Sequence, residues 1–294
     1  MIERIFAALI SFLMSVLSFF GIILPHYDTY PNIKYGESAM QTMDIYVPYD
    51  AEDNAENSAV IFLHGGMFKS GDKSEMIDEC KTLADKGFIT VTMDYSLIGG
   101  NTKISMRTML EDIDNALDKL SDFSIEKGLN IKKIALAGNS AGGTLALYYS
   151  YYRSIYSQFD IAFAAAKTAP TDFDFSIWSD NYSKETFADL VSRLSGQQIT
   201  GEELDSVKGK EICQNISPVK HLTSASKIPT LLGFAVKDTT VPYGNKASIE
   251  NKLKEVKGSY DIIDFTNSNH DLSFDILQKA DYDNLLLSYC QKYF

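Results

Sequence analysis

The segment from Ile134 to Tyr148 constrains this chain more than any other. Four apolar residues, Ile134–Ala137, are followed by Gly138-Asn139-Ser140-Ala141-Gly142 and then by a stretch that favours a helix. A buried strand that turns directly into a helix needs small residues on both sides of the turn, because the backbones pass very close. The Gly-x-Ser-x-Gly pattern therefore predicts that Ser140 stands clear of a sheet, at the positive end of a helix. A purely structural glycine turn is the alternative, which the flanking strand and helix disfavour.

Apolar runs and amphipathic segments alternate along the rest of the chain. Strands are expected over 43–47, 59–63, 88–93, 134–137, 161–166, 230–236 and 260–265, and helices over 75–86, 106–126, 247–256 and from 274 onward. This alternation predicts an α/β fold, with a mostly parallel central sheet and helices on both faces. The strand at 43–47 ends at Pro48, which is typical of an antiparallel edge strand.

A serine hydroxyl becomes a nucleophile only when a base takes its proton and a carboxylate orients that base. His270 is the expected base because it lies in a polar loop after the last predicted strand. Of the other histidines, His26 borders the N-terminal apolar run, His64 is expected to orient its own loop, and His221 is expected to lie in a lid or a core.

The expected carboxylate is Asp238, which directly follows the strand at 230–236. It stands between the serine and the histidine in chain order, and the two alternative acids are Asp264 and Asp271. All of these candidates follow or end predicted strands, at the edge where parallel sheets meet their ligands.

A reaction through a tetrahedral intermediate also needs donors for the developing oxyanion. His64-Gly65-Gly66 follows the strand at 59–63, and glycine lets backbone N–H groups approach a substrate closely. Gly65 or Gly66, together with Ala141, is therefore expected to form an oxyanion hole.

From about residue 35 onward the chain resembles an α/β-hydrolase-fold serine esterase with a His-Gly-Gly oxyanion loop. The resemblance is to the hormone-sensitive-lipase-like carboxylesterases and the feruloyl- or acetyl-esterase-like enzymes. It rests on these segments: 44–48, 64–66, 94–95, 138–143, 217–218, 238–242 and 270–271. It implies a serine carboxylesterase that hydrolyses short-chain or carbohydrate-linked esters through an acyl-enzyme, without a cofactor. It also implies that residues 171–222 form a small helical lid.

Two other functions share these residues. A serine peptidase or amidase uses the same triad, and a non-catalytic binding domain would keep only the fold. The non-catalytic binding domain is disfavoured, because all the triad and oxyanion residues are present.

The amino-acid composition limits the classes of molecule that the protein is expected to bind. The formal net charge of −12 disfavours nucleic acid, whose phosphates attract clustered Lys and Arg, so a small-molecule ester is the expected partner. Three scattered cysteines, Cys80, Cys213 and Cys290, are too few for a disulfide framework or a zinc site. One bridge with a spare thiol is the alternative to the buried thiols that we expect. No metal site is expected.

Residues 5–24 form a run of 20 mainly apolar residues, which as a helix would span about 30 Å. The expected organisation is therefore an N-terminal hydrophobic segment over residues 1–27 and a catalytic domain over 28–294. An uncleaved membrane anchor is favoured, with the catalytic domain outside the cytoplasm. A removed signal peptide, which would make the protein secreted, and a helix packed on the domain are the alternatives.

Overall fold

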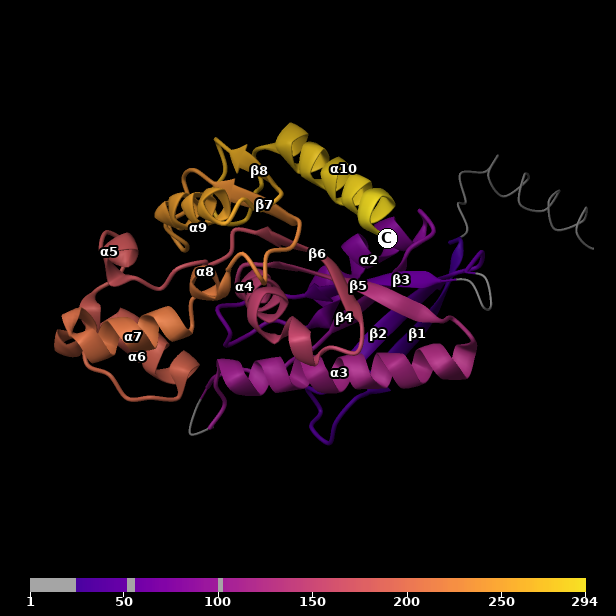
Figure 1. Ribbon diagram of the computed structural model, residues 1–294, viewed down its shortest axis with the longest axis horizontal. Helices are drawn as coiled ribbons and strands as arrows, with labels where there is room; N and C mark the ends of the chain where they lie inside the picture. Colours follow the sequence, from indigo (N-terminus) through magenta and orange to yellow (C-terminus); the bar gives the residue numbers. More distant parts are fainter. Residues whose placement is uncertain (1–24, 52–55, 100–102) are drawn as a thin grey trace, which may run out of the picture.

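The computed structural model describes residues 25–51, 56–99 and 103–294, and an eight-stranded sheet forms its centre (Figure 1). The strands are β1 (Tyr27–Lys34), β2 (Thr42–Pro48), β3 (Asn57–Leu63), β4 (Ile89–Met93), β5 (Ile131–Asn139), β6 (Asp160–Lys167), β7 (Thr230–Ala235) and β8 (Tyr260–Phe265). They lie in the order β1-β2-β4-β3-β5-β6-β7-β8. The β1–β2 and β2–β4 pairs are antiparallel and all the others are parallel, which confirms the expected mostly parallel sheet.

The edge strand of the sheet is not the one that the sequence predicted. Residues 43–47 do not form the edge strand, because β1 pairs along the outer side of β2. β1 is mostly exposed and carries Pro31 next to an irregularity in its register, which only an edge strand tolerates well. Its few buried side chains left no alternating pattern in the sequence.

Helices cover both faces of the sheet. They are η1 (Lys73–Met76), α2 (Ile77–Ala84), α3 (Met106–Lys127), α4 (Ala141–Tyr148), η2 (Tyr149–Arg153), η3 (Ser154–Tyr156), α9 (Gly244–Glu255) and α10 (Ile276–Tyr293). Ile61 and Leu136 point into the core shared with α3 and α4, whereas Phe62 and Ala135 point into the core shared with α2 and α10. The period of two along the buried strands thus separates the two layers.

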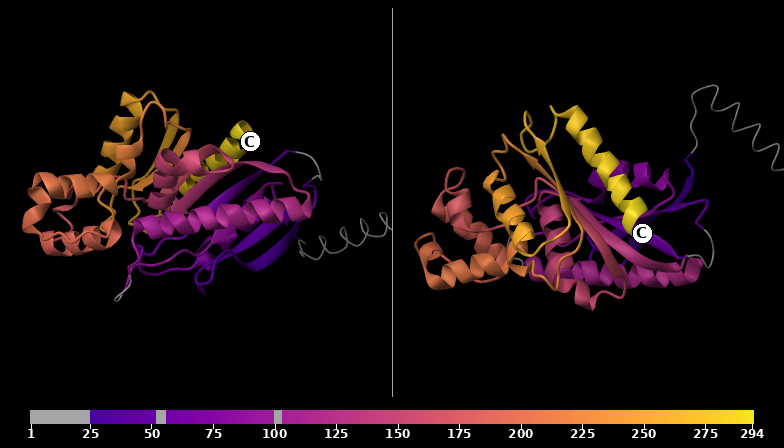
Figure 2. Two further views of the ribbon diagram at one scale, coloured as in Figure 1. Left: turned by 60° about the horizontal axis from the view of Figure 1, so that its bottom comes forward. Right: turned by 45° about the horizontal axis from the view of Figure 1, so that its top comes forward.

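Between β6 and β7 the chain leaves the sheet and forms a group of short helices at one end of the molecule (Figure 2). They are α5 (Phe175–Trp178), α6 (Lys184–Ser195), η4 (Glu202–Asp205), α7 (Val207–Asn215) and α8 (Pro218–His221). Phe173 stacks on Trp178 at 5.7 Å, and Phe187 lies 5.4 Å from the Trp178 ring. These aromatic side chains therefore pack the lid segment (residues 171–222) onto the core that it shares with α3, α4 and the sheet.

The proposed N-terminal anchor at residues 5–24 lies outside the described residues. Among the residues that the structure does describe, no helix combines the length and hydropathy needed to cross a bilayer.

The three cysteines are buried and free, as expected. Cys80 of α2 and Cys290 of α10 lie in the core between these helices and the sheet, and Cys213 of α7 lies in the core shared with the lid segment. Burial raises the pKa of the Cys213 and Cys290 thiols to about 12, so both remain protonated at neutral pH.

Candidate active site

Ser140 stands at the turn between β5 and α4, with φ 51° and ψ −119°. The glycines on either side are required by packing. A Cβ on Gly142 would lie 2.1 Å from the carbonyl oxygen of Leu63, and one on Gly138 would lie 2.5 Å from the carbonyl carbon of Gly142. Neither clash involves a side chain that could move aside. Only glycine therefore allows β3, β5 and α4 to approach closely enough to form this turn.

The structure brings Ser140, His270 and Asp238 together although they are far apart in sequence. His270 Nε2 lies 2.9 Å from Ser140 Oγ, and His270 Nδ1 lies 2.7 Å from Asp238 Oδ2. The other carboxylate oxygen, Asp238 Oδ1, accepts hydrogen bonds from the backbone N–H groups of Thr240 (2.8 Å) and Val241 (2.9 Å). An Nδ1–H that donates to Asp238 leaves Nε2 free to accept the serine proton.

The alternative acids have other partners. Asp264 accepts hydrogen bonds from Tyr243 (2.9 Å) and Lys246 (2.5 Å). Asp271 accepts one from the Ser273 hydroxyl at 3.0 Å. Both carboxylates are therefore engaged away from the His270 ring.

His64 and His221 have hydrogen-bond partners of their own. His64 is fully buried, with Nδ1 2.8 Å from its neighbour's carbonyl oxygen, and burial lowers its pKa. His221 lies in α8, where Nε2 is 3.0 Å from the Asn215 carbonyl oxygen, and burial lowers its pKa as well. The Nδ1 contact of His64 lies within its own loop, and its role in orienting that loop stays a prediction.

The loop that carries Gly65 and Gly66 has an unusual backbone. Gly66 has φ 102°, and the next two residues, Met67 and Phe68, have φ 51° and 62°. The Tyr95 hydroxyl donates to the His64 carbonyl oxygen at 2.8 Å, and its ring stacks on His64 at 4.2 Å. A Cβ on Gly65 would lie 3.5 Å from Ser140 Cβ, so this loop passes directly beside the serine.

A cleft of about 280 Å³ opens at the serine. Gly65, Gly66, Ser140 and His270 all line it. Ala141 is the first residue of α4, so its N–H belongs to the first turn, which has no partner within the helix. The predicted oxyanion residues thus lie around one space, and their role stays a prediction.

Two supports of this site gave no clear signal in the sequence. Asp275, just before α10, accepts hydrogen bonds from the backbone N–H groups of Asn267 (2.9 Å) and Ser268 (2.7 Å). Burial opposes its charge, but the hydrogen bonds from Ser268 and Asn267 outweigh burial and lower its pKa. A short polar stretch before a helix was the only hint that this residue fixes the His270 loop.

The second support is Asn245, which is fully buried at the start of α9. Its Oδ1 accepts from the N–H groups of Thr171 (2.9 Å) and Asp172 (3.0 Å), and its Nδ2 donates to the Pro242 carbonyl oxygen at 3.0 Å. It therefore joins the beginning of the lid segment to the loop that follows Asp238.

No group of three or more His, Cys, Asp or Glu side chains within 25–51, 56–99 and 103–294 is arranged to hold a metal ion.

A family model designated BD-FAE matches residues 43–253, which is more than two thirds of the chain and includes Ser140 and Asp238. The chain belongs to the BD-FAE family. This is a family of α/β-hydrolase-fold esterases, which confirms the resemblance and the fold class inferred from the sequence. His270 lies beyond the BD-FAE match, so its place in the site comes from the structure alone.

Proteins with similar sequences include one named an esterase and one named a kynurenine formamidase. Esterase LipI of Mycobacterium tuberculosis is 33% identical over 103 residues, covering 35% of this chain and 31% of its own. A kynurenine formamidase of Meyerozyma guilliermondii is 28% identical over 126 residues, covering 42% of this chain and 43% of the formamidase. The chain thus spans less than half the length of these relatives.

Among solved structures, a truncated carbohydrate esterase from gut microbiota superposes with a TM-score of 0.73. It has 15% identity, and the superposition covers 91% of this chain and 98% of that one. At this identity the likeness shows the shared fold.

Proposed function

We propose that this protein is a serine carboxylesterase that hydrolyses short-chain or carbohydrate-linked esters through an acyl-enzyme intermediate. The observation that carries the proposal is the continuous hydrogen-bonded series from Ser140 Oγ through His270 to Asp238 Oδ2. Membership of an esterase family supports it.

The steps follow from this geometry. His270 Nε2 takes the proton as Ser140 Oγ attacks the ester carbonyl, and Asp238 stabilises the imidazolium that forms. The N–H groups of Gly65 or Gly66 and of Ala141 stabilise the oxyanion. His270 then gives its proton to the departing alcohol, which leaves an acyl group on Ser140. Water attacks the acyl-enzyme, His270 takes its proton, and the serine and the free acid are released.

The substrate part of the proposal is supported by names among the similar proteins. One relative is called an esterase, and a structural neighbour is called a carbohydrate esterase. The first name fits ester hydrolysis, and the second fits an ester whose alcohol is a carbohydrate.

A second candidate function is amide hydrolysis, since one relative is named a kynurenine formamidase. The same triad attacks amides. The amine is a poorer leaving group than an alcohol, so its nitrogen must be protonated by His270 before the C–N bond breaks. Esters and amides sharing one acyl group separate the two functions.

The test is a panel of p-nitrophenyl acyl esters set against formanilide and peptide p-nitroanilides. We expect turnover of the esters and loss of that turnover in Ser140→Ala. Ser288→Ala is the matched control, because Ser288 is exposed on α10. Amide turnover that exceeds ester turnover would replace the esterase with the amidase, and equal ester rates in wild type and Ser140→Ala would refute both.

We also propose that residues 5–24 anchor the protein in a membrane, with the domain over 28–294 outside the cytoplasm and residues 171–222 acting as its lid. The support is the length and hydropathy of the run at 5–24. Replacing Phe12, Leu13 and Phe20 by Asp should move the protein from the membrane to the soluble fraction of lysed cells. Unchanged membrane association would contradict the anchor.

A further inference from the structure

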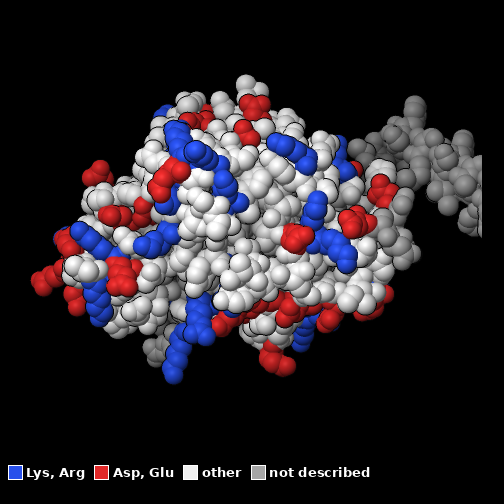
Figure 3. All heavy atoms as spheres, in the orientation of Figure 1, with Lys and Arg blue, Asp and Glu red and all other residues white. Residues whose placement is uncertain are grey.

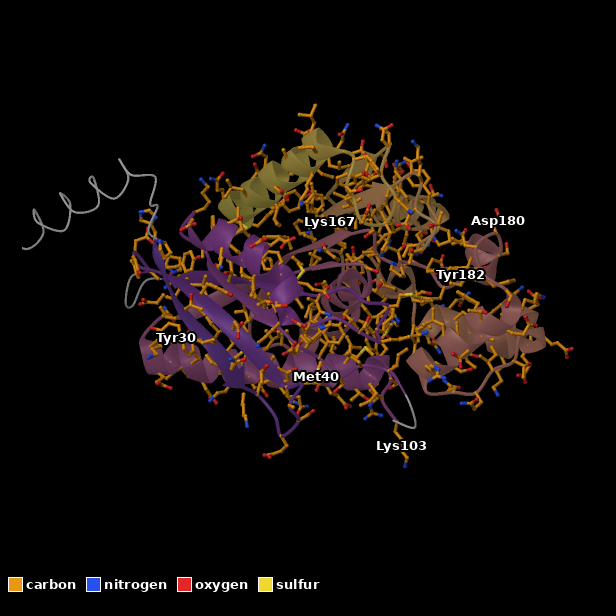
Figure 4. The ribbon with its side chains drawn as sticks, turned by 180° about the vertical axis from the view of Figure 1, so that it is seen from behind. Tyr30, Met40, Lys103, Lys167, Asp180 and Tyr182 are labelled. Carbon is orange, nitrogen blue, oxygen red and sulfur yellow. The ribbon has the colours of Figure 1, made fainter. Side chains whose placement is uncertain are left out.

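A groove of about 510 Å³ lies at the opposite end of α4 from Ser140, between the beginning of α3, the turns η2 and η3, and the ends of α6 and α7. Tyr148, the last residue of α4, lines it, and eight residues of helix place Tyr148 about 12 Å from Ser140. Neither Asp238 nor His270 lines this groove. In Figure 4 Lys103, which precedes α3, is labelled below the lid helices, at the end of the molecule where α3 begins in Figure 1.

Tyr148, Tyr152 and Tyr156 line one wall of this tyrosine groove. They recur at every fourth residue through the end of α4, the π-helical turn η2 and the 3-10 turn η3. Tyr148 is buried, whereas Tyr152 is 50% exposed and Tyr156 is 71% exposed. A π-helical turn is rare in proteins and is frequent at functional sites. Two large aromatic rings are thus presented to solvent along one groove.

The ring of Tyr152 is held by its neighbours. Its centroid lies 5.5 Å from that of Tyr148 and 4.5 Å from that of His221. The Tyr148 hydroxyl donates to the Asn215 carbonyl oxygen at 2.9 Å, and His221 Nε2 lies 3.0 Å from the same oxygen. Both neighbours are therefore tied to the end of α7. A ring held in this way loses little conformational freedom when a ligand binds to it.

The ring of Tyr156 has a charged neighbour that is itself held in place. The guanidinium carbon of Arg153 lies 5.9 Å from the centroid of the Tyr156 ring. Arg153 Nε donates to Asp114 Oδ2 at 2.7 Å, and the Tyr149 hydroxyl donates to Asp114 Oδ1 at 2.8 Å. The contact with α3 through Asp114 thus fixes the guanidinium beside Tyr156.

The charges that line the groove are paired. Arg107 Nε donates to Glu111 Oε1 at 2.9 Å, and Arg153 is paired with Asp114. A nucleotide or a phospholipid headgroup needs cations that are free to contact its phosphate. Because each arginine in this groove already has a carboxylate partner, the groove favours an uncharged ligand.

Polar groups lie beside the exposed rings. Glu111, Ser195 and Gln197 line the groove and offer both donors and acceptors. An alkyl chain would leave these groups unpaired. A sugar satisfies both kinds of surface, because its C–H face packs on the electron-rich face of an aromatic ring and its hydroxyl groups donate and accept. Small-ligand sites occupy about 300–1,000 Å³, and two rings, Tyr152 and Tyr156, suit more than one linked sugar.

We propose that the tyrosine groove binds a neutral oligosaccharide. Tyr152 and Tyr156 stack on the sugar rings, and Tyr148 and His221 position Tyr152. This site is separate from the proposed esterase centre and does not depend on its activity. It holds the protein on a carbohydrate chain while the triad remains free to act.

The test is isothermal titration calorimetry of the full-length protein with unesterified hexasaccharides derived from xylan, cellulose and mannan. Wild type is compared with Tyr152→Ala, Tyr156→Ala, the double variant and Tyr152→Phe. Tyr49→Ala is the matched control, because Tyr49 is 62% exposed directly after β2 and does not line the groove. Circular dichroism checks that every variant is folded.

Wild type should bind at least one of the three hexasaccharides. Each change of tyrosine to alanine in the groove should raise Kd about tenfold, since removing an aromatic ring from beneath a stacked ligand has an effect of this size. Tyr152→Phe should retain binding, because stacking requires the ring and not its hydroxyl. Tyr49→Ala should keep the Kd of wild type.

Three results would overturn the inference. The first is that wild type binds none of the three hexasaccharides, and the second is that wild type and the double variant have equal Kd values. The third is a dimer of wild type that the double variant loses in light scattering, which would assign the rings to an interface between copies of this chain. Because an unesterified sugar requires no hydrolysis, all three results are independent of the ester test with Ser140→Ala.

Discussion

Asp238 shows how one side chain serves two purposes. One carboxylate oxygen contacts His270, and the other accepts two backbone N–H groups of the loop that follows. The backbone contacts fix the orientation of the carboxylate toward the His270 ring.

We therefore expect Asp238→Asn to fold normally, because the amide oxygen still accepts from that loop. Its kcat should fall by about 10⁴-fold, since the amide favours the wrong tautomer of His270. Circular dichroism and ester turnover measure the two effects. Asp271→Asn is the control and should keep most of the activity; a large loss in Asp271→Asn with a small one in Asp238→Asn would reassign the acid.

The glycines beside Ser140 make a second residue-level prediction. Gly142→Ala places a methyl 2.1 Å from Leu63 O and 2.3 Å from His64 O, and both are backbone atoms within the packed sheet. We expect destabilisation of at least about 3 kcal/mol, seen as a lower Tm or loss of soluble protein. At Gly99 an added Cβ meets no atom within 4 Å, so Gly99→Ala should leave Tm nearly unchanged. Equal Tm values for the two variants would contradict the close approach.

At the scale of elements, the lid segment and the loops of the sheet act as one unit. Asn245 joins residues 171–172 to Pro242, and Asn181 donates to the Thr239 carbonyl oxygen at 3.0 Å. The loop that positions Asp238 is thus tied to the lid segment.

Removing Asn245 tests that connection. Asn245→Ala leaves the buried N–H groups of Thr171 and Asp172 without their acceptor, which should cost about 1–3 kcal/mol of folding free energy. Urea denaturation measures this loss, and ester turnover should fall with it because the Asp238 loop loosens. Asn251→Ala, at an exposed position of the same helix, should change neither; a comparable loss there would assign the effect to the helix instead.

The molecule as a whole carries a net negative charge, and its described residues bury three clusters of apolar side chains. In the view of Figure 3 acidic side chains line much of the lower edge, where α3 runs in Figure 1, and both signs mix elsewhere. This surface offers no broad basic area on that face, in keeping with a formal net charge of −12.

The reactivity of the buried thiols measures the exposure of the cores on both faces of the sheet. Cys80 of α2 and Cys290 of α10 lie in the core on one face of the sheet, and Cys213 lies in the core on the other face. We expect all three to resist a thiol reagent in the folded protein and to react together once urea unfolds it, because their exposures of 0–3% leave no access. Thiol titration against urea concentration checks this. A thiol that reacts well before the circular dichroism signal changes would show that one core opens independently.

Sequence patterns alone predict the alternation of strands and helices, the turn at Ser140 and the meeting of that serine with His270 and Asp238. Each of these depends on local chemistry: the hydrophobic period, the size of glycine, and the position of a polar residue after an apolar run. β1 is not predicted, because an exposed edge strand buries too few side chains to give an alternating hydrophobic pattern.

Other features of the site are visible only in the folded chain. The supports Asp275 and Asn245, the pairing of Lys167 with Glu79, and the tyrosine groove all join residues from separate elements. Their roles arise from distances across the fold. Such distances depend on how whole layers pack, and no short stretch of sequence carries that information.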